Sequence, residues 1–220
     1  RITASKQCPE QLGRIDILTN SGHLRPIERT TIAQLKSDAV IALMFESWEM
    51  RDGDIDLAAC RERGIRIAGV NERHPAVDVF SYLGPLCARQ LHDAGIPVYG
   101  NKIALLCDNH FSSFLERSLR QLGGKVCLFR NTAELMSDQW DCIVIALHPG
   151  AEPRVGLAEA AMLAEKAKGA IIAQFWGDID RPSLRDRGFG LYPEHEPKRG
   201  HMAVLLSEIG PDPIVRLQAG

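Results

Sequence analysis

The stretch KIALLCDNHFSSFLERSLRQLGGKVCLFR, from Lys102 to Arg130, decides the fold. It begins with an apolar run that is typical of a buried strand, and a short polar turn follows this run. Apolar residues then recur at helical spacing until Gly123, which ends the predicted helix, and a second apolar run completes the stretch. A strand, a turn, a helix and another strand in this order are the first part of a parallel, doubly wound sheet.

The same alternation of strands and helices extends along the rest of the chain. Mainly apolar runs predict further strands at Asp38–Phe45, Ile65–Val70, Asp141–Leu147 and Ala170–Phe175. The connector AGIPVYGN begins at Ala94, and we place a domain boundary there. The sequence therefore predicts an α/β protein with a doubly wound parallel, Rossmann-like sheet in residues 95–220 and a second, smaller flavodoxin-like α/β domain in residues 1–94.

Composition and charge narrow the class of protein. The 220 residues are 45% hydrophobic and 25% charged, as in ordinary globular proteins, and the net charge of −2 gives no basis for nucleic-acid binding. No apolar run is long enough to span a membrane. The six cysteines form no CxxC pair and the seven histidines are scattered, so we expect reduced thiols, a cytoplasmic location and no metal site. Because the sequence begins with Arg1 and not with methionine, it leaves open whether part of the first domain lies upstream of residue 1.

Three stretches together carry a resemblance to a known family, the D-isomer-specific 2-hydroxyacid dehydrogenases (the formate and glycerate dehydrogenase group). Asp54–Val70 looks like the helix–strand unit of that family's substrate domain, and Asn101–Arg130 matches its first Rossmann strand, turn, helix and second strand. Asp141–Leu184 is similar to a later strand, loop and helix. The resemblance implies a substrate-type domain in residues 1–94 and a nucleotide-binding domain in residues 95–220. It also implies an oxidoreductase that uses NADP or NAD and forms a homodimer.

The turn after the first Rossmann strand departs from the family's pattern. The three glycines of that pattern fall on Cys107, Asn109 and Ser112, and His110 lies among them. The resemblance makes these four residues candidates for binding the cofactor. Asp108, however, places a carboxylate at the helix N-terminus, where it competes with a phosphate for the free N–H groups. The alternative is that Asp108 or Asn109 simply caps the helix.

Arg130 is a further cofactor-binding candidate. It ends the second apolar run, where the family commonly has the acidic residue that holds the adenosine ribose. An arginine at this place suits a 2′-phosphate and therefore favours NADP over NAD. The alternative is a solvated charge at a strand end, in a protein that binds no cofactor.

Catalytic residues are not matched by any motif. The segment QFWGDIDR puts Gly177 or Asp178 near the position of the family's arginine, and Arg181 follows several residues later. Glu208 stands near the position of the family's histidine. We take His148, Asp178 and Glu208 as catalytic candidates because each follows a predicted strand. A hydride-transfer enzyme needs a group that moves a proton and a cation that holds the substrate carboxylate, and the sequence assigns neither.

Side chains that follow the predicted strands form a candidate substrate site. They are Glu46, Trp48, Arg73, His74 and Trp176. Because the carboxyl ends of parallel strands share one edge of a sheet, this charged and aromatic lining suits a small polar metabolite. The alternative for each of these residues is a solvated loop side chain.

Two functions from different classes follow from these patterns. The first is an NAD(P)-dependent oxidoreductase with an altered phosphate-binding turn. The second is a non-catalytic ligand-binding or partner-binding protein that keeps the two-domain scaffold. A ligand without a pyrophosphate, such as S-adenosylmethionine, is a third option. The turn from Cys107 to Ser112 distinguishes the dinucleotide-dependent function from the other two. A turn that is filled by its own side chains has no room for two phosphates.

Overall fold

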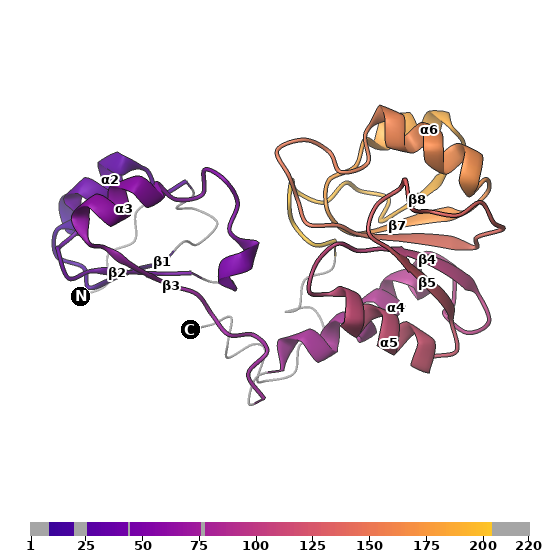
Figure 1. Cartoon of the computed structure of the whole chain (residues 1–220), viewed down its shortest axis with the longest axis horizontal. Coiled ribbons are helices and arrows are strands. Elements are labelled where there is room, and N and C mark those ends of the chain that lie inside the picture. The colour runs from indigo at the N-terminus through magenta and orange to yellow at the C-terminus, as the bar shows by residue number, and fades with distance from the viewer. Residues whose placement is uncertain (1–8, 20–25, 44, 76–77, 204–220) are drawn as a thin grey trace. The chain divides into compact units, whose positions relative to one another are not determined.

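The computed structural model describes residues 9–19, 26–43, 45–75 and 78–203. Its contacts divide the chain into two compact units, Arg1–His74 and Pro75–Gly220, which are described separately (Figure 1). Each unit contains a parallel sheet, with three strands in the first unit and five in the second. The α/β class and the parallel sheets expected from the sequence are thereby confirmed. None of the described helices is both long enough and apolar enough to cross a membrane.

A small parallel sheet with helices packed on it forms the first unit. Its strands, in the spatial order β1-β2-β3, are β1 (Ile17–Thr19), β2 (Val40–Ala42) and β3 (Arg66–Ala68). Its helices are α1 (Pro9–Leu12), α2 (Arg29–Gln34), the 3-10 turn η1 (Ser47–Glu49) and α3 (Leu57–Arg63). Helices α2 and α3 lie over one face of the sheet, and the core beneath them contains the fully buried Ile32 and Ile41 (Figure 1). Helix α3 begins after Asp56, because this carboxylate accepts the Ala59 N–H at 2.8 Å.

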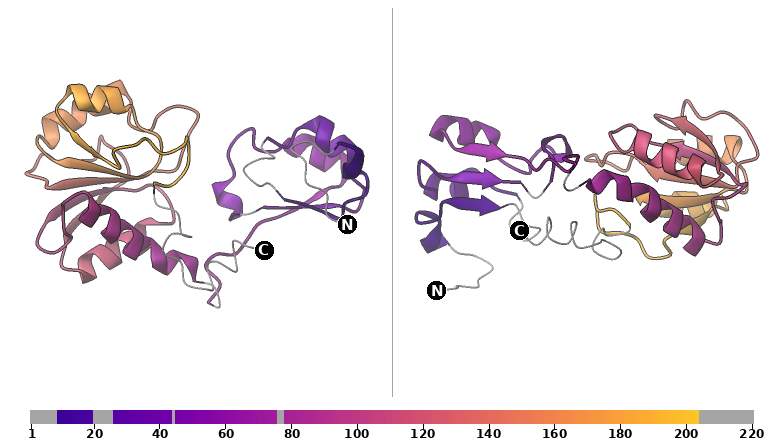
Figure 2. Two further views of the ribbon diagram at one scale, coloured as in Figure 1. Left: turned by 180° about the vertical axis from the view of Figure 1, so that it is seen from behind. Right: turned by 90° about the horizontal axis from the view of Figure 1, so that it is seen from below.

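A doubly wound sheet of the Rossmann type forms the second unit. Its strands, in the spatial order β5-β4-β6-β7-β8, are β4 (Lys102–Leu106), β5 (Lys125–Phe129), β6 (Cys142–Ala146), β7 (Ile171–Trp176) and β8 (Gly190–Tyr192). Its helices are η2 (Val79–Tyr82), α4 (Leu83–Asp93), α5 (Ser112–Gln121), α6 (Leu157–Lys166) and α7 (Arg181–Asp186). Helices α4 and α5 cover one face and α6 covers the other (Figures 1 and 2). Strand β6 and residues 103–106 of β4 are buried throughout, as expected for continuous apolar runs at the centre of such a sheet.

Helix α4 belongs to the second unit, although the sequence analysis assigns it to the first domain. It packs against α5 and β7. Gly84 in α4 lies so close to α5 that an added Cβ would be 2.1 Å from the side chain of Ser118. The division between the units therefore falls between His74 and Pro75, and not after residue 94. The substrate-binding and nucleotide-binding roles of the two parts remain predictions.

The strand order of the sheet reverses at the carboxyl ends of β4 and β6. The chain passes from β4 to β5 on one side and reaches β6 on the other side of β4. Ligands of doubly wound sheets bind at such a switch point. The turn of residues 107–111 follows β4 there, and the loop of residues 147–156 follows β6.

Candidate functional site

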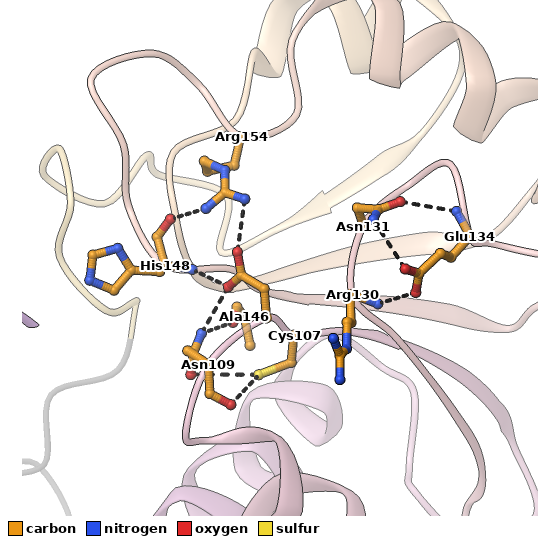
Figure 3. A network of polar contacts seen from close by, with 9 residues as sticks. Cys107, Asn109, Arg130, Asn131, Glu134, Ala146, His148 and Arg154 are labelled. Carbon is orange, nitrogen blue, oxygen red and sulfur yellow. Dashed lines mark hydrogen bonds and ion pairs between the residues drawn. The ribbon is translucent and has the colours of Figure 1, made fainter. Parts of the chain in front are cut away.

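Asn109 connects the turn after β4 to the end of β6. Its side-chain Nδ2 donates to the carbonyl oxygen of Ala146 at 2.7 Å (Figure 3). Its Oδ1 accepts the backbone N–H of Phe111 at 3.0 Å. Its own carbonyl accepts the N–H of Ser112, the first residue of α5, at 3.2 Å. Both ends of the Asn109 amide are thus used to close the turn, where a glycine would leave the backbone open to a phosphate.

Two further residues of this turn have their side chains packed inward. Cys107 is buried, and its sulfur lies 3.6 Å from Oδ1 of Asn109. Burial raises the pKa of Cys107 to about 12, so the thiol is neutral and unreactive at physiological pH. The buried ring of Phe111 lies between Phe80 and Trp176, with centroid distances of 5.4 Å and 4.9 Å. His110, in contrast, is exposed.

The Asp108 carboxylate spans the switch point beside Asn109. Its Oδ1 accepts the backbone N–H of His148 at 2.8 Å, and its Oδ2 forms an ion pair with Nη2 of Arg154 at 2.8 Å (Figure 3). Nη1 of Arg154 also donates to the His148 carbonyl. Burial acts to raise the pKa of Asp108, but the His148 N–H and the Arg154 guanidinium together outweigh it and hold that pKa below its ordinary value. Asp108 is therefore a carboxylate at neutral pH.

We call the contacts of Asp108 and Asn109 with Ala146, His148 and Arg154 the switch-point network. All of them join the turn after β4 to β6 or to the loop that follows it. In a dinucleotide site a pyrophosphate approaches the backbone at this place, and the helix N-terminus favours its negative charge. Here a side-chain amide and a side-chain carboxylate already span it.

Arg130 lies where the sequence analysis expects it, directly after β5. Its backbone N–H donates to Oε2 of Glu134 at 2.9 Å, and Oδ1 of Asn131 accepts the Glu134 N–H at 3.1 Å. The exposed side chain of Arg130 extends away from these two residues, on the side of Cys107 (Figure 3). Its guanidinium is therefore at the surface beside the turn, as contact with an anion would require.

The catalytic candidates His148 and Asp178 both lie at strand ends of the second unit. The half-buried His148 ring is 5.2 Å from the ring of Trp176, which is a substrate candidate. Oδ1 of Asp178 accepts the N–H of Gly200 at 2.7 Å, and the indole N–H of Trp176 donates to the Gly200 carbonyl at 3.2 Å. Asp178 thus holds a loop in place. Glu208 lies outside the described residues, and none of these catalytic roles is tested.

Arg181 is buried, and its guanidinium is bonded to groups of the same unit. It is only 2% exposed; its guanidinium donates to Oε1 of Gln174 at 2.7 Å and to the carbonyls of Pro193 and Glu194, the latter at 3.1 Å. Burial lowers the pKa of Arg181, although an arginine stays charged at neutral pH. The nearest arginine to the family's catalytic position is therefore bonded within the core of this unit. Its place directly after Asp180, which caps the short helix α7, is the sequence signal for this role.

Three substrate candidates come together in the first unit. The Glu46 carboxylate is 3% exposed and accepts the indole N–H of Trp48 at 2.6 Å. It also accepts Nε and Nη2 of Arg73, at 3.3 Å and 3.1 Å, and the backbone N–H of Glu72 at 3.0 Å. The predicted proximity is present, but Glu46 bonds to its own neighbours. His74 is exposed, and Trp176 belongs to the other unit.

Glu72 also belongs to the polar residues around Glu46, although it is not one of the substrate candidates. Burial, together with the nearby carboxylates of Glu49 and Glu46, raises its pKa to about 8. Glu72 is therefore largely protonated at neutral pH. Its sequence signal is its place in the loop after β3, since Glu46 and Glu49 lie in the loop after the neighbouring strand β2.

Comparison with known proteins shows the fold. No model of a protein family and no curated protein matches the chain. Among solved structures, the pyruvate reductase of Chlamydomonas reinhardtii is 19% identical, with a TM-score of 0.58 over 98% of this chain and 74% of that one. A glyoxylate reductase from Paecilomyes thermophila is 19% identical, with a TM-score of 0.55 over 86% of this chain and 73% of that one. The NAD+-bound 3-phosphoglycerate dehydrogenase of Entamoeba histolytica is 12% identical, with a TM-score of 0.55 over 80% and 61%. The chain thus resembles D-isomer-specific 2-hydroxyacid dehydrogenases in structure, as the sequence analysis expects.

Proposed function

We propose that this protein is a non-redox ligand-binding protein on a 2-hydroxyacid dehydrogenase fold, and that it takes a small polar ligand instead of a dinucleotide. One observation carries the proposal: the switch-point network fills the turn after β4 with the protein's own amide and carboxylate. A turn filled in this way has no room for the two phosphates of a dinucleotide.

The cost of admitting a pyrophosphate supports this proposal. A phosphate about 4 Å from the Asp108 carboxylate is repelled by roughly 1 to 4 kcal/mol near a protein surface. Displacing the charge-assisted bonds of Asp108 and the amide bond of Asn109 costs about 2 kcal/mol more. Together these penalties weaken dinucleotide binding by about two to four powers of ten.

No motif of the sequence matches the proton-moving group or the substrate cation of the family, and this also favours a non-redox role. Hydride transfer to or from a hydroxy acid needs both. Arg181 is bonded within the core, and Asp178 holds the Gly200 loop. A second candidate function, an NADP-dependent oxidoreductase, is favoured by the exposed guanidinium of Arg130 beside the turn, which suits a 2′-phosphate. The homodimer and the cytoplasmic location remain predictions.

A titration of NADPH and NADH against the purified protein tests the proposal. We expect no saturable change in tryptophan fluorescence below about 1 mM dinucleotide for the wild type. The double variant Asp108→Gly/Asn109→Gly removes the carboxylate and the amide, and it should bind NADPH more tightly than the wild type. Micromolar NADPH binding by the wild type that Arg130→Ala weakens selectively over NADH would overturn the proposal in favour of the NADP-dependent enzyme.

A further inference from the structure

The backbone of Arg154 is fixed by contacts with residues 178–180, and its guanidinium is bonded to the backbone of His148. The Arg154 N–H donates to the Asp178 carbonyl at 2.7 Å, and the next residue, Val155, forms a parallel bridge with Ile179. The Val155 carbonyl accepts the N–H of Asp180 at 2.8 Å. Through Nη1 the guanidinium also donates to the His148 carbonyl. Its other terminal nitrogen, Nη2, contacts the same carboxylate that accepts the His148 N–H.

The group at that point is the carboxylate of Asp108. One of its oxygens accepts a backbone N–H and the other accepts a guanidinium nitrogen, each at 2.8 Å. A free carboxylate or phosphate is bound by proteins through the same two kinds of donor. The Asp108 side chain is part of a turn and not of a strand or helix, so it can leave by side-chain rotation without breaking the strand pairing of β4 and β6. It is 23% exposed and Arg154 is 31% exposed, so solvent reaches both.

We propose that Arg154 and the His148 N–H form a binding site for a small oxyanion, a carboxylate or a phosphate, which the Asp108 carboxylate occupies until a ligand displaces it. This inference rests on the proposed function, because it names the chemistry of the ligand that takes the place of a dinucleotide. A ligand with one accessible oxyanion fits, since the site offers one guanidinium edge and one N–H. A pyrophosphate does not, since Asn109 closes the neighbouring approach to Ala146.

Chemical rescue tests this site. Asp108→Ala empties it, and 100 mM formate or acetate should then raise the melting temperature by about 2 to 4 °C more than the same concentration of chloride. The wild type should show a smaller rise, because the oxyanion must first displace the Asp108 carboxylate there. Inorganic phosphate in a parallel arm distinguishes a phosphate ligand from a carboxylate ligand. The double variant Asp108→Ala/Arg154→Ala should lose the rescue entirely.

Asp138 supplies a matched control. Its carboxylate forms an ion pair with Lys102 and accepts the backbone N–H of Gln139. These contacts lie at the opposite end of β4. Asp138→Ala should show no rescue, because the lysine has no fixed fork of donors. If Asp108→Ala does not fold, Asp108→Ser shortens the side chain and takes its place in the same titration. Absence of rescue in the folded variant, or equal rescue with and without Arg154, would overturn the inference. The NADPH titration judges the proposed function separately, since it measures the wild type without added oxyanion.

Discussion

Replacing Asn109 by glycine measures how far the switch-point network stabilises the second unit. The substitution removes the bond to the Ala146 carbonyl at 2.7 Å and the bond to the Phe111 N–H at 3.0 Å. Ala146 and Phe111 are both buried, so each polar group that is left without this partner costs about 1 kcal/mol even if water partly replaces it. Glycine adds roughly 0.5 to 1 kcal/mol through the entropy of the unfolded chain. We therefore expect Asn109→Gly to lower the free energy of unfolding by about 3 kcal/mol.

Urea unfolding followed by tryptophan fluorescence measures this loss. Trp140 and Trp176 report on the second unit, and the Trp48→Phe background removes the signal of the first. Asn131→Gly is the matched control: its side chain also accepts a backbone N–H, that of Glu134, but in an exposed loop. It should cost no more than about 1 kcal/mol. Equal losses for the two variants would refute the reasoning, because the bond across the switch point would then add nothing.

Three further substitutions or treatments test other parts of the structure. Glu72 keeps its proton in the folded state up to a pKa of about 8 but releases it near 4.5 when unfolded, so stability should fall as pH rises between these values, by at most about 5 kcal/mol. Glu72→Gln should abolish this slope in urea midpoints at pH 5.5 and 8.5, and an unchanged slope would contradict it. Arg181→Lys should cost about 2 to 4 kcal/mol, because lysine cannot reach Gln174 and the Glu194 carbonyl together; a neutral effect in the same unfolding assay would disprove its structural role. Among the described thiols of the native protein, half-buried Cys127 should react first with a disulfide reagent, and mass spectrometry that finds Cys107 labelled equally fast would contradict its burial.

The sequence predicts the centre of the second unit well because burial on both faces leaves an unmistakable pattern. Strand β6 is a continuous apolar run, β4 and β7 are apolar except for Lys102 and Gln174, and glycine or proline marks the ends of the helices between them. Strand β8, Gly190–Tyr192, is missed, since a three-residue edge strand carries no such run. The place of α4 is missed for another reason: the contact of Gly84 with Ser118 joins residues whose proximity no local pattern records.

The candidate site is predictable in its location but not in its bonding. The sequence places Asp108 and Asn109 at the switch point and identifies the conflict between a carboxylate and a phosphate. It gives no sign that their partners are Ala146, His148 and Arg154, which lie 37 to 46 residues further along the chain. In the first unit the partners of Glu46 are local or follow the adjacent strand, and there the predicted grouping is found.

The switch-point network also accounts for how the fold can persist without a cofactor. A Rossmann-type switch point exposes backbone groups at the ends of two central strands, and such groups need partners. In this chain the Ala146 carbonyl and the His148 N–H obtain them from Asn109 and Asp108, so these two backbone groups are satisfied from within the chain. Since a ligand stabilises a protein only by binding its folded state, a dinucleotide that finds these groups already bonded should leave the melting temperature unchanged. The carboxylate of Asp108 can be replaced by a ligand, because another oxyanion can take over its two donors at little net loss of charge-assisted bonding. The amide of Asn109 cannot be replaced in this way. It supplies a donor to the Ala146 carbonyl, and an oxyanion, which is an acceptor, cannot supply one.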